Sequence, residues 1–517
     1  MIRFLNGRKK RKSAIIGMQE EEKKTSHFLQ NLNGWSVTGG PDSRSDGLRS
    51  GMEKDMRKRV LGTFLTGIML ASQLLACAGT GQEEKTEESS VQSGGDQGEA
   101  LIFTYWGSTA EKEVIEKILA KFTEDTGIEV EGMHIPDDYE TKLTALVAAG
   151  EAPDLGYLAI PTAYTWYEDH VIADFNDILA ADEEYNPDDY LDTAMVYYDD
   201  EKIMGILTAI EGTAIFYNKE MFEAAGVEAP QSLEENWTWD EFVEVARKLT
   251  LDSEGRNAAD SGFDPENIVQ YAMKWDLGQV TLDSIAKNNG ASYIAEDGTS
   301  GWTSPEMVEV VQNVADLINV HHVMPSKTGG DNLPSAEIAL QSGVYAMTMS
   351  GQWILNNFAQ MDGLEIGIAP VPSMGKEDRM VLGSSELAIF EDSDKKEEAW
   401  LLAKYLTDPA NAPDVYAGGL WMPIRRDWYE DEELIAQWVD NEAHPDEYRE
   451  FMLEPVRDNG EYLSELYVKN FNRMWDVLNP ALENLWNGRE TSAETVLKSI
   501  ESDLNELTEG TYGKIGK

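Results

Sequence analysis

Short apolar segments alternate with amphipathic segments from residue 100 onward, and this alternation limits the fold more than any other feature of the chain. The segment "ALIFTYW" is typical of a buried strand, and "IEVEGMHI" and "PDLGYLAI" follow it as further strand patterns. Between the first two strands, 108–127 carries a helical face capped by Ser108 or Thr109 and ended by Gly127; its apolar members are Val114, Ile115, Ile118, Leu119 and Phe122. The alternation predicts an α/β fold of mixed, mostly parallel sheets flanked by helices.

The length and charge of the chain narrow the classes of protein that it can belong to. With 517 residues the chain is too long for one hydrophobic core, so at least two lobes are expected. It carries 95 acidic against 42 basic residues, a net charge of −53, which argues against a nucleic-acid partner because phosphate binding needs clustered Lys and Arg. No glycine-rich phosphate loop follows a strand, so no nucleotide cofactor is expected.

Catalytic and metal-binding motifs are also missing from the sequence. It holds neither G-x-S-x-G nor H-E-x-x-H. Of its six histidines, the adjacent His321 and His322 point to opposite sides of most backbones, which disfavours a shared metal. We therefore expect no catalytic residues, no metal and no cofactor.

The single cysteine, Cys77, ends an apolar run that follows a basic segment. Residues 57–59 are Arg, Lys and Arg, and the 17 residues of 60–76 are largely apolar, which is short for a bilayer span and typical of a signal peptide. The last four residues, Leu-Leu-Ala-Cys, resemble the bacterial lipobox, and that resemblance implies that Cys77 is lipidated. The alternative is a buried cysteine in an ordinary core helix, but the flanking residues argue against it.

The segments on either side of this run have different expected roles. Residues 77–99 are rich in Glu, Ser, Gly and Gln, so they predict a disordered tether between the lipid anchor and the lobes. Residues 1–55 have no clear periodicity and precede the expected signal peptide at 56–76. We interpret them as a non-native extension, with translation starting at Met52 or Met56.

Five segments, in a constant order, resemble the extracellular solute-binding proteins of bacterial ABC importers, of the carbohydrate type; they include "FTEDTGIEVEGMHIPDDYETKLTALVAAGEAPDLGYL", "GILTAIEGTAIFYNK", "ALQSGVYAMTMSGQW", "GIAPVPSMG" and "KKEEAWLLAKYLTD". The resemblance implies a two-lobed periplasmic-binding-protein-like fold (class II) with hinge strands. Lobe I would comprise 100–209 and 371–420, and lobe II 214–370 and 421–517.

The same resemblance implies a function outside the cytoplasm. Such a protein is a monomer that captures a sugar or oligosaccharide between its lobes and delivers it to ABC permease subunits. Lipidated Cys77 would attach it to the outer face of the cell membrane. The likeness to the maltose-binding members is distant, and Leu158 stands where they carry an aromatic residue, so maltose is not supported as the ligand.

The resemblance also implies a set of ligand-binding residues, since sugars need aromatic rings against their C–H faces and carboxylates or amides on their hydroxyls. It points to Glu211, Gly351, Trp353, Ser385, Glu386, Trp421, Arg425 and Trp475. Trp106 and Asp138 join them because they follow strands, where ligands of α/β sheets are usually met. The alternatives stay open: core packing for the tryptophans, a helix cap for Asp138, and solvated charges for Glu211 and Arg425.

Two other classes of protein compete with this interpretation. A secreted glycoside hydrolase would need two carboxyl groups around a scissile bond, and acidic pairs are unavoidable in so acidic a chain, so their presence decides nothing. A structural surface adhesin is disfavoured by the long alternation of strands and helices.

Overall fold

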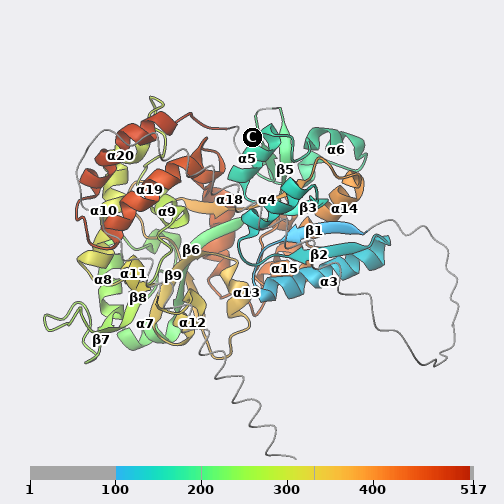
Figure 1. Ribbon diagram of the computed structural model, residues 1–517. Coiled ribbons are helices and arrows are strands. Elements are labelled where there is room, and N and C mark those ends of the chain that lie inside the picture. Colours follow the sequence, from blue (N-terminus) through green and yellow to red (C-terminus); the bar gives the residue numbers. More distant parts are fainter. Residues whose placement is uncertain (1–99, 200, 331, 513–517) are drawn as a thin grey trace, which may run out of the picture. The chain divides into compact units, whose positions relative to one another are not determined.

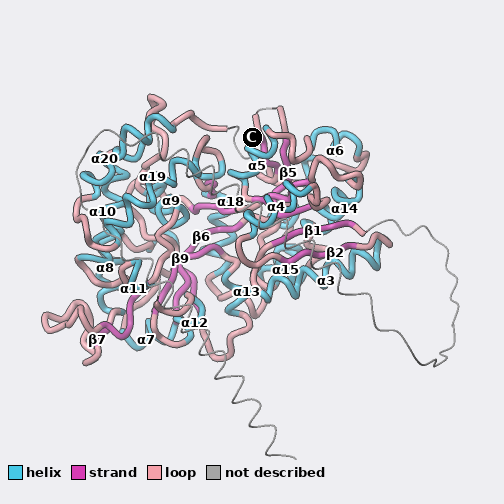
Figure 2. The backbone as a smooth tube through the Cα atoms, viewed as in Figure 1, coloured by secondary structure: helices cyan, strands magenta, loops and turns pink. Residues whose placement is uncertain are grey.

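The computed structural model describes residues 100–199, 201–330 and 332–512, so the expected extension, signal peptide, Cys77 and tether lie outside the described residues. Strands and helices alternate along this chain, as the sequence predicts, and Figures 1 and 2 show helices flanking the strands of two sheets. All described residues belong to one compact unit.

The first sheet has the strand order β2-β1-β3-β12-β5-β4. Its strands are β1 (Leu101–Tyr105), β2 (Val130–His134), β3 (Leu155–Leu158), β4 (Met195–Tyr197), β5 (Ile203–Leu207) and β12 (Glu386–Ile389). β1 pairs in parallel with β2 and β3, whereas β12 runs antiparallel to both β3 and β5. The carboxyl ends of β1, β2 and β3 therefore lie at one edge.

The helices packed around this sheet include the one that the sequence predicts best. Helix α3 (Thr109–Thr126) begins after Ser108, whose hydroxyl accepts a hydrogen bond from the amide of Glu111 at 3.1 Å, and it ends at Gly127 with φ of 75°. Ile115, Ile118, Leu119 and Phe122 are buried, which confirms the predicted face, and Val114 is half-buried. The other helices before the second sheet are α4 (Tyr139–Ala149), α5 (Ile160–Glu168), α6 (Phe175–Ala181) and the short η2 (Pro187–Asp189).

The second sheet has the order β13-β11-β6-β9-β8-β7, with β10 also paired to β6. Its strands are β6 (Glu211–Asn218), β7 (Leu251–Asp252), β8 (Ile268–Met273), β9 (Tyr345–Gly351), β10 (Ile366–Ala369), β11 (Met380–Gly383) and β13 (Gly460–Tyr462). Both sheets are mixed, as expected. Among the described strands antiparallel pairs outnumber parallel ones, because strands that enter from the other sheet, such as β12, arrive in the opposite direction.

The remaining helices of the described chain are divided between the two sheets, since some of them contact α3 beside the first sheet. They are α7 (Lys219–Ala225), η3 (Leu233–Glu235), α8 (Trp239–Leu249), α9 (Gln279–Asn288), η4 (Gly301–Thr303), α10 (Pro305–Asn319), α11 (Lys327–Gly330), α12 (Ala336–Gln341), α13 (Ile354–Phe358), α14 (Lys396–Thr407), α15 (Pro413–Ala417), α16 (Asp427–Glu430), α17 (Glu432–Val439), the π-helical η5 (Arg449–Leu453), α18 (Glu454–Asn459), η6 (Ser464–Leu466), α19 (Phe471–Trp486) and α20 (Ala493–Leu507). Helices α10, α19 and α20 pack together beside the second sheet (Figure 1).

Three segments carry the chain between the sheets, and they lie side by side. The amide of Thr208 donates to the carbonyl of Ser385 at 2.9 Å, and the hydroxyl of Ser384 donates to the carbonyl of Ala209 at 2.6 Å. Ile210 and Met422 exchange backbone hydrogen bonds. We call 208–210, 384–385 and 420–422 the crossover segments. Since β11 belongs to the second sheet, the second crossover follows residue 383, whereas lobe I was expected to resume at 371; the full lobe limits stay a prediction.

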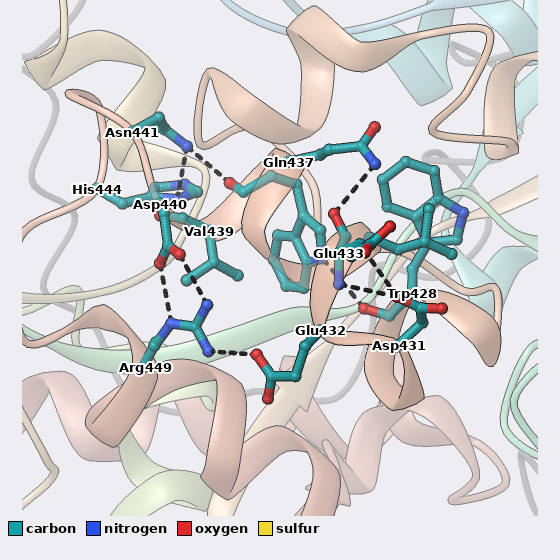
Figure 3. Close-up of polar contacts among 12 residues, drawn as sticks. Trp428, Asp431, Glu432, Glu433, Gln437, Val439, Asp440, Asn441, His444 and Arg449 are labelled. Carbon is teal, nitrogen blue, oxygen red and sulfur yellow. Dashed lines mark hydrogen bonds and ion pairs between the residues drawn. The ribbon is translucent and has the colours of Figure 1, made fainter.

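A network of surface charges holds the region around α17 together (Figure 3). Arg449 donates to both carboxylate oxygens of Asp440, at 2.9 and 2.8 Å, and to Glu432 at 3.3 Å. Beside it the Nδ1 of His444 lies 3.1 Å from the carbonyl of Val439, and the His444 ring stacks on Tyr448. These bonds fix the loop that leads from α17 into η5.

Among the described residues, no helix has both the length and the apolar character that crossing a membrane requires. Nor does the described part of the chain bring together three or more His, Cys, Asp or Glu side chains that could hold a metal ion.

Candidate functional site

A cavity of about 350 Å³ lies where the crossover segments meet the end of β1, and we call it the crossover pocket. Its residues come from both sheets and from α3 and α13. They are Trp106, Gly107, Ser108, Glu111, Tyr157, Glu211, Trp353, Asn357, Ser385, Leu420 and Trp421. Four of these side chains are aromatic, two are carboxylic acids, and none is Lys, Arg or His.

The first wall of the crossover pocket is built by the turn from β1 into α3. Trp106 follows β1 and meets Tyr139 and Tyr157 edge to face, with ring centroids 5.0 and 5.2 Å apart. Gly107 has φ of 124°, and a Cβ there would lie 1.9 Å from the Oε2 of Glu111. Glycine is therefore needed for the backbone to turn and for the Glu111 carboxyl to lie against it.

The two carboxyl groups of the crossover pocket are held in an environment that favours their neutral form. The pKa of Glu111 is raised to about 8, chiefly by burial and also by the charge of Glu211, while the Ser108 amide and the Tyr157 hydroxyl offset part of that rise. Burial also raises the pKa of Glu211 to about 7. A carboxyl group that is removed from water without a nearby cation keeps its proton to a higher pH, because desolvation penalises the charged form.

A second cavity, of about 570 Å³, adjoins the crossover pocket through Trp353, and we call it the wide pocket. It is lined by residues of the second sheet and its helices: Lys274, Trp275, Asp276, Leu277, Gly278, Gln279, Met324, Pro325, Ser326, Lys327, Gly330, Ala336, Glu337, Thr348, Met349, Ser350, Trp353, Ile354, Trp475 and Asn479. Asn357 of the crossover pocket donates to Glu337 of the wide pocket at 3.1 Å, which links the two walls.

Trp353 lies at the boundary of the two pockets because of Gly351, the last residue of β9, two positions before it. A Cβ on Gly351 would lie 1.8 Å from the Cζ3 of Trp353, so the ring folds directly over the backbone of this glycine. The ring is half-buried, and it lines both cavities. Trp475, on α19, lines the wide pocket and stacks on Phe471 with planes 11° apart.

Seven of the ten ligand-binding residues expected from the sequence lie at these cavities. Trp106, Glu211, Trp353, Ser385 and Trp421 line the crossover pocket, Trp475 lines the wide pocket, and Gly351 supports Trp353. The hydroxyl of Ser385 lies 2.8 Å from that of Thr208, so it also ties two crossover segments together. Their contact with a ligand stays a prediction.

Glu386 lies away from both cavities. Its neighbour Ser385 faces the crossover pocket, and successive strand residues point to opposite faces. The side chain of Glu386 is fully buried against Gly205, where a Cβ would lie 3.2 Å from the Glu386 Cδ, and neither carboxylate oxygen has a hydrogen-bond partner among the described residues. Burial raises the pKa of Glu386 to about 8.

Asp138 and Arg425 also lie elsewhere. Asp138 is exposed at the start of α4 with φ of 52°, and its side chain makes no capping hydrogen bond, so neither interpretation of its carboxylate is supported there. Arg425 lines a separate cavity of about 300 Å³. Its guanidinium group lies 3.8 Å from the carboxylate of Asp189 and 5.3 Å from the ring centre of Tyr190, so its charge is already partnered within the protein.

Several pocket residues have no signal in the sequence that would single them out. Glu111 occupies the first turn of α3, where acidic residues are common because they favour the positive end of a helix. Tyr157 lies within a buried strand and reads as core. Only their position beside the Trp106 turn, at the carboxyl end of the sheet, could have suggested them.

The sequence pattern of the family described as "Bacterial extracellular solute-binding protein" matches residues 117–445. The chain belongs to this family. Among its relatives, the multiple sugar-binding protein of Streptococcus mutans is 24% identical over 356 residues, 66% of this chain and 77% of that one. The arabinooligosaccharide-binding protein of Halalkalibacterium halodurans is 24% identical over 292 residues, 54% and 60% of the two chains.

A solved structure shares the architecture. An ABC substrate-binding protein from Listeria monocytogenes, in complex with cycloalternan, superposes with a TM-score of 0.67 at 23% identity, covering 79% of this chain and 99% of that one. The expected two-lobed fold of solute-binding proteins is therefore confirmed.

Proposed function

We propose that this protein is the solute-binding component of an ABC import system, which captures a sugar or oligosaccharide and delivers it to a membrane permease. It belongs to an extracellular family, so its work is done outside the cytoplasm. The relatives named for arabinooligosaccharides and multiple sugars, and the neighbour solved with cycloalternan, support a carbohydrate as the solute.

The observation that carries the proposal is the position of Trp353 between two adjoining cavities. Its ring can cover the flat C–H face of one sugar unit, while neighbouring units enter the crossover pocket on one side and the wide pocket on the other. The combination of rings with carboxyl and amide groups suits the two surfaces of a sugar. The presence of two cavities favours an oligosaccharide over a single unit.

Binding would act by changing the populations of open and closed forms. The crossover pocket takes residues from both sheets, so a ligand there contacts both halves at once. Moving the equilibrium from 1:99 to 99:1 needs about 5.5 kcal/mol of differential binding, and a micromolar dissociation constant corresponds to about 8 kcal/mol. The closed form would then be what the permease recognises.

A thermal-shift screen of the purified protein against mono- and oligosaccharides tests the proposal. A ligand at 100 times its dissociation constant adds about 2.7 kcal/mol to stability, a visible rise in melting temperature. Trp353→Ala should weaken the strongest ligand by about tenfold or more, because it removes a ring from both cavities. Trp166→Ala, on α5 and outside both cavities, is the matched control and should leave affinity unchanged.

Two results would contradict the proposal. Equal affinity of the Trp353→Ala variant and the unchanged protein would remove the observation on which it depends. Consumption of a bound sugar on overnight incubation would identify a glycoside hydrolase instead, with the Glu111 and Glu211 carboxyls as its candidate pair.

The same proposal includes attachment to the membrane through a lipidated Cys77. A diacylglycerol with a further acyl chain would hold the protein far more firmly than one chain, which binds only marginally. Cys77→Ser should release nearly all of the protein from the membrane fraction of a bacterial host, whereas Ser72→Ala, in the same apolar run, should leave it there. Membrane retention of the Cys77→Ser variant would contradict the anchor.

A further inference from the structure

Aromatic rings and acids line both cavities, since the wide pocket includes Asp276 and Glu337, but only the crossover pocket has its acids without any basic side chain. Trp106, Tyr157, Trp353 and Trp421 surround Glu111 and Glu211, and no basic side chain lines the cavity. The wide pocket, in contrast, contains Lys274 and Lys327, of which Lys327 is paired with Glu483 at 2.9 Å. The two adjoining cavities therefore differ in the charge that they offer a ligand.

Two polar side chains of the crossover pocket are deeply buried, and the hydroxyl of one of them is incompletely bonded. Glu111 is 8% exposed and Tyr157 is 2% exposed. The Tyr157 hydroxyl lies close enough to Glu111 to affect its carboxyl, yet it forms no hydrogen bond of ordinary geometry with any described residue. A buried hydroxyl without a partner costs free energy, so its natural partner is a group that arrives with the ligand.

Such a cavity has the chemistry that recognises a positively charged nitrogen. The faces of aromatic rings attract ammonium groups, and rings that surround one form the usual site for quaternary ammonium ligands. Two carboxyl groups that lack a cation inside the protein gain most from one supplied by a ligand, because opposite charges attract strongly in a desolvated site.

We propose that the crossover pocket binds an organic ammonium group, so that the captured solute is a sugar carrying a free amino group. This inference rests on the proposed function for the sugar part of the ligand, whereas the ammonium part rests on the pocket alone. The amino group lies between Glu111 and Glu211 against the rings, and the rest of the ligand extends past Trp353 into the wide pocket.

Among the described residues, no basic group from a neighbouring element acts on the two carboxyls. Glu111, on α3, is faced by Glu211 from β6, by Tyr157 from β3 and by Tyr105 from β1. The imidazole of His134, on β2, bonds the carbonyl of Gly107 at 2.9 Å and is not among the lining residues. No charge of the described residues that line the pocket substitutes for the ammonium group.

Binding of the ammonium group is coupled to the release of protons. With raised pKa values, Glu111 and Glu211 are partly protonated near neutral pH, and an adjacent positive charge favours their ionised forms. Affinity for the ammonium ligand therefore rises as pH increases from 5 to 7, whereas affinity for an uncharged sugar of the same skeleton does not rise.

Calorimetric titration of matched ligands tests the inference. The ligands are glucosamine, galactosamine and the β-1,4-linked glucosamine trimer, each beside its N-acetylated and its hydroxyl counterpart, with choline as an ammonium ion that is not a sugar. We expect one amine to bind about tenfold or more tightly than both counterparts at pH 7. Glu111→Gln should remove that preference, and Glu113→Gln, on the exposed face of α3, should keep it.

Each outcome bears on the inference separately from the proposed function. Tighter binding of a hydroxyl or N-acetylated sugar overturns the ammonium pocket and leaves sugar capture standing. Binding of choline without any sugar supports the ammonium pocket and contradicts sugar capture. An amine preference that survives in Glu111→Gln, or the absence of binding by every amine tested, overturns the inference.

Discussion

The carboxyls of the crossover pocket and the buried carboxyl of Asp283 have opposite surroundings. In the crossover pocket, Glu111 and Glu211 border an open cavity and have no cationic neighbour among its lining residues. Asp283, on α9, is 1% exposed, but it accepts hydrogen bonds from the amide and the hydroxyl of Ser464 at 2.6 and 2.8 Å. The charge of Lys287 also acts on it.

The difference separates a structural carboxyl from one that is available to a ligand. The bonds at Asp283 join α9 to η6, and Lys287 extends the cluster to Glu461 on β13 at 2.6 Å. Burial raises the pKa of Asp283, while Lys287 and Ser464 offset part of that rise. Glu111 also has an amide and a hydroxyl nearby, from Ser108 and Tyr157, but no cation among the residues that line the crossover pocket compensates Glu111 or Glu211. A desolvated acid that borders a cavity and has no cationic partner is the stronger mark of a binding site.

Glu386 is a third case and limits that rule. It is as buried as Asp283 and neither of its carboxylate oxygens has a hydrogen-bond partner among the described residues, yet it lines neither of the two adjoining cavities. Without space for a ligand, its raised pKa indicates a neutral acid in the core beside Gly205. Both features, the missing cation and the cavity, are needed to argue for binding.

The largest expected effect comes from breaking the structural cluster. Lys287→Met leaves Asp283 buried with less compensation, so the free energy of unfolding should fall by about 3 kcal/mol. Urea unfolding followed by tryptophan fluorescence measures the change. Arg449→Gln, in the exposed network around α17 (Figure 3), is the matched control and should cost well under 1 kcal/mol.

A second variant distinguishes the loss of charge compensation from a loss of packing. If Lys287→Met acts by leaving a charge unpaired, adding Asp283→Asn should recover part of the lost stability, since the carboxylate is then absent. If the double variant is as unstable as the sum of the two single variants, packing and not charge explains the loss, and the contrast with the crossover pocket fails.

The helices and strands around the site could be predicted from the sequence in more detail than the site itself. The face of α3 and its ends at Ser108 and Gly127 follow from local patterns, because capping and apolar spacing act within a few residues. Trp106 could be placed because it ends a strand at the carboxyl edge of a sheet. These inferences need no knowledge of distant contacts.

The resemblance to a family identified segments but not the direction of each side chain. Ser385 in a crossover segment and Glu386 at the start of β12 are adjacent in the chain, yet consecutive residues of an extended backbone point to opposite faces. Trp421 lines the crossover pocket, whereas Arg425, four residues later, lies against Tyr190. Glu111 was missed because its partner acid, Glu211, lies 100 residues away in the chain and meets it only in the folded protein.

A smaller effect is expected in the pH dependence of stability, and it tests the pocket carboxyls directly. The folded-state pKa values of Glu111 and Glu211, about 8 and about 7, lie above the ordinary pKa of a glutamate. At a pH between the ordinary pKa and these raised values, the folded protein therefore holds more protons than the unfolded chain. Stability without ligand should therefore fall as pH rises from 5 to 8. Glu111→Gln removes the contribution of this carboxyl and should make the fall in stability shallower by about 1 kcal/mol or more, since one unit of pKa corresponds to about 1.4 kcal/mol.

Urea unfolding between pH 5 and pH 8 measures this pH dependence of stability, with Glu113→Gln as the control. If stability falls with pH equally in the unchanged protein and in both variants, Glu111 ionises as an ordinary carboxyl does. The argument that its carboxyl is available to a cationic ligand would then not hold.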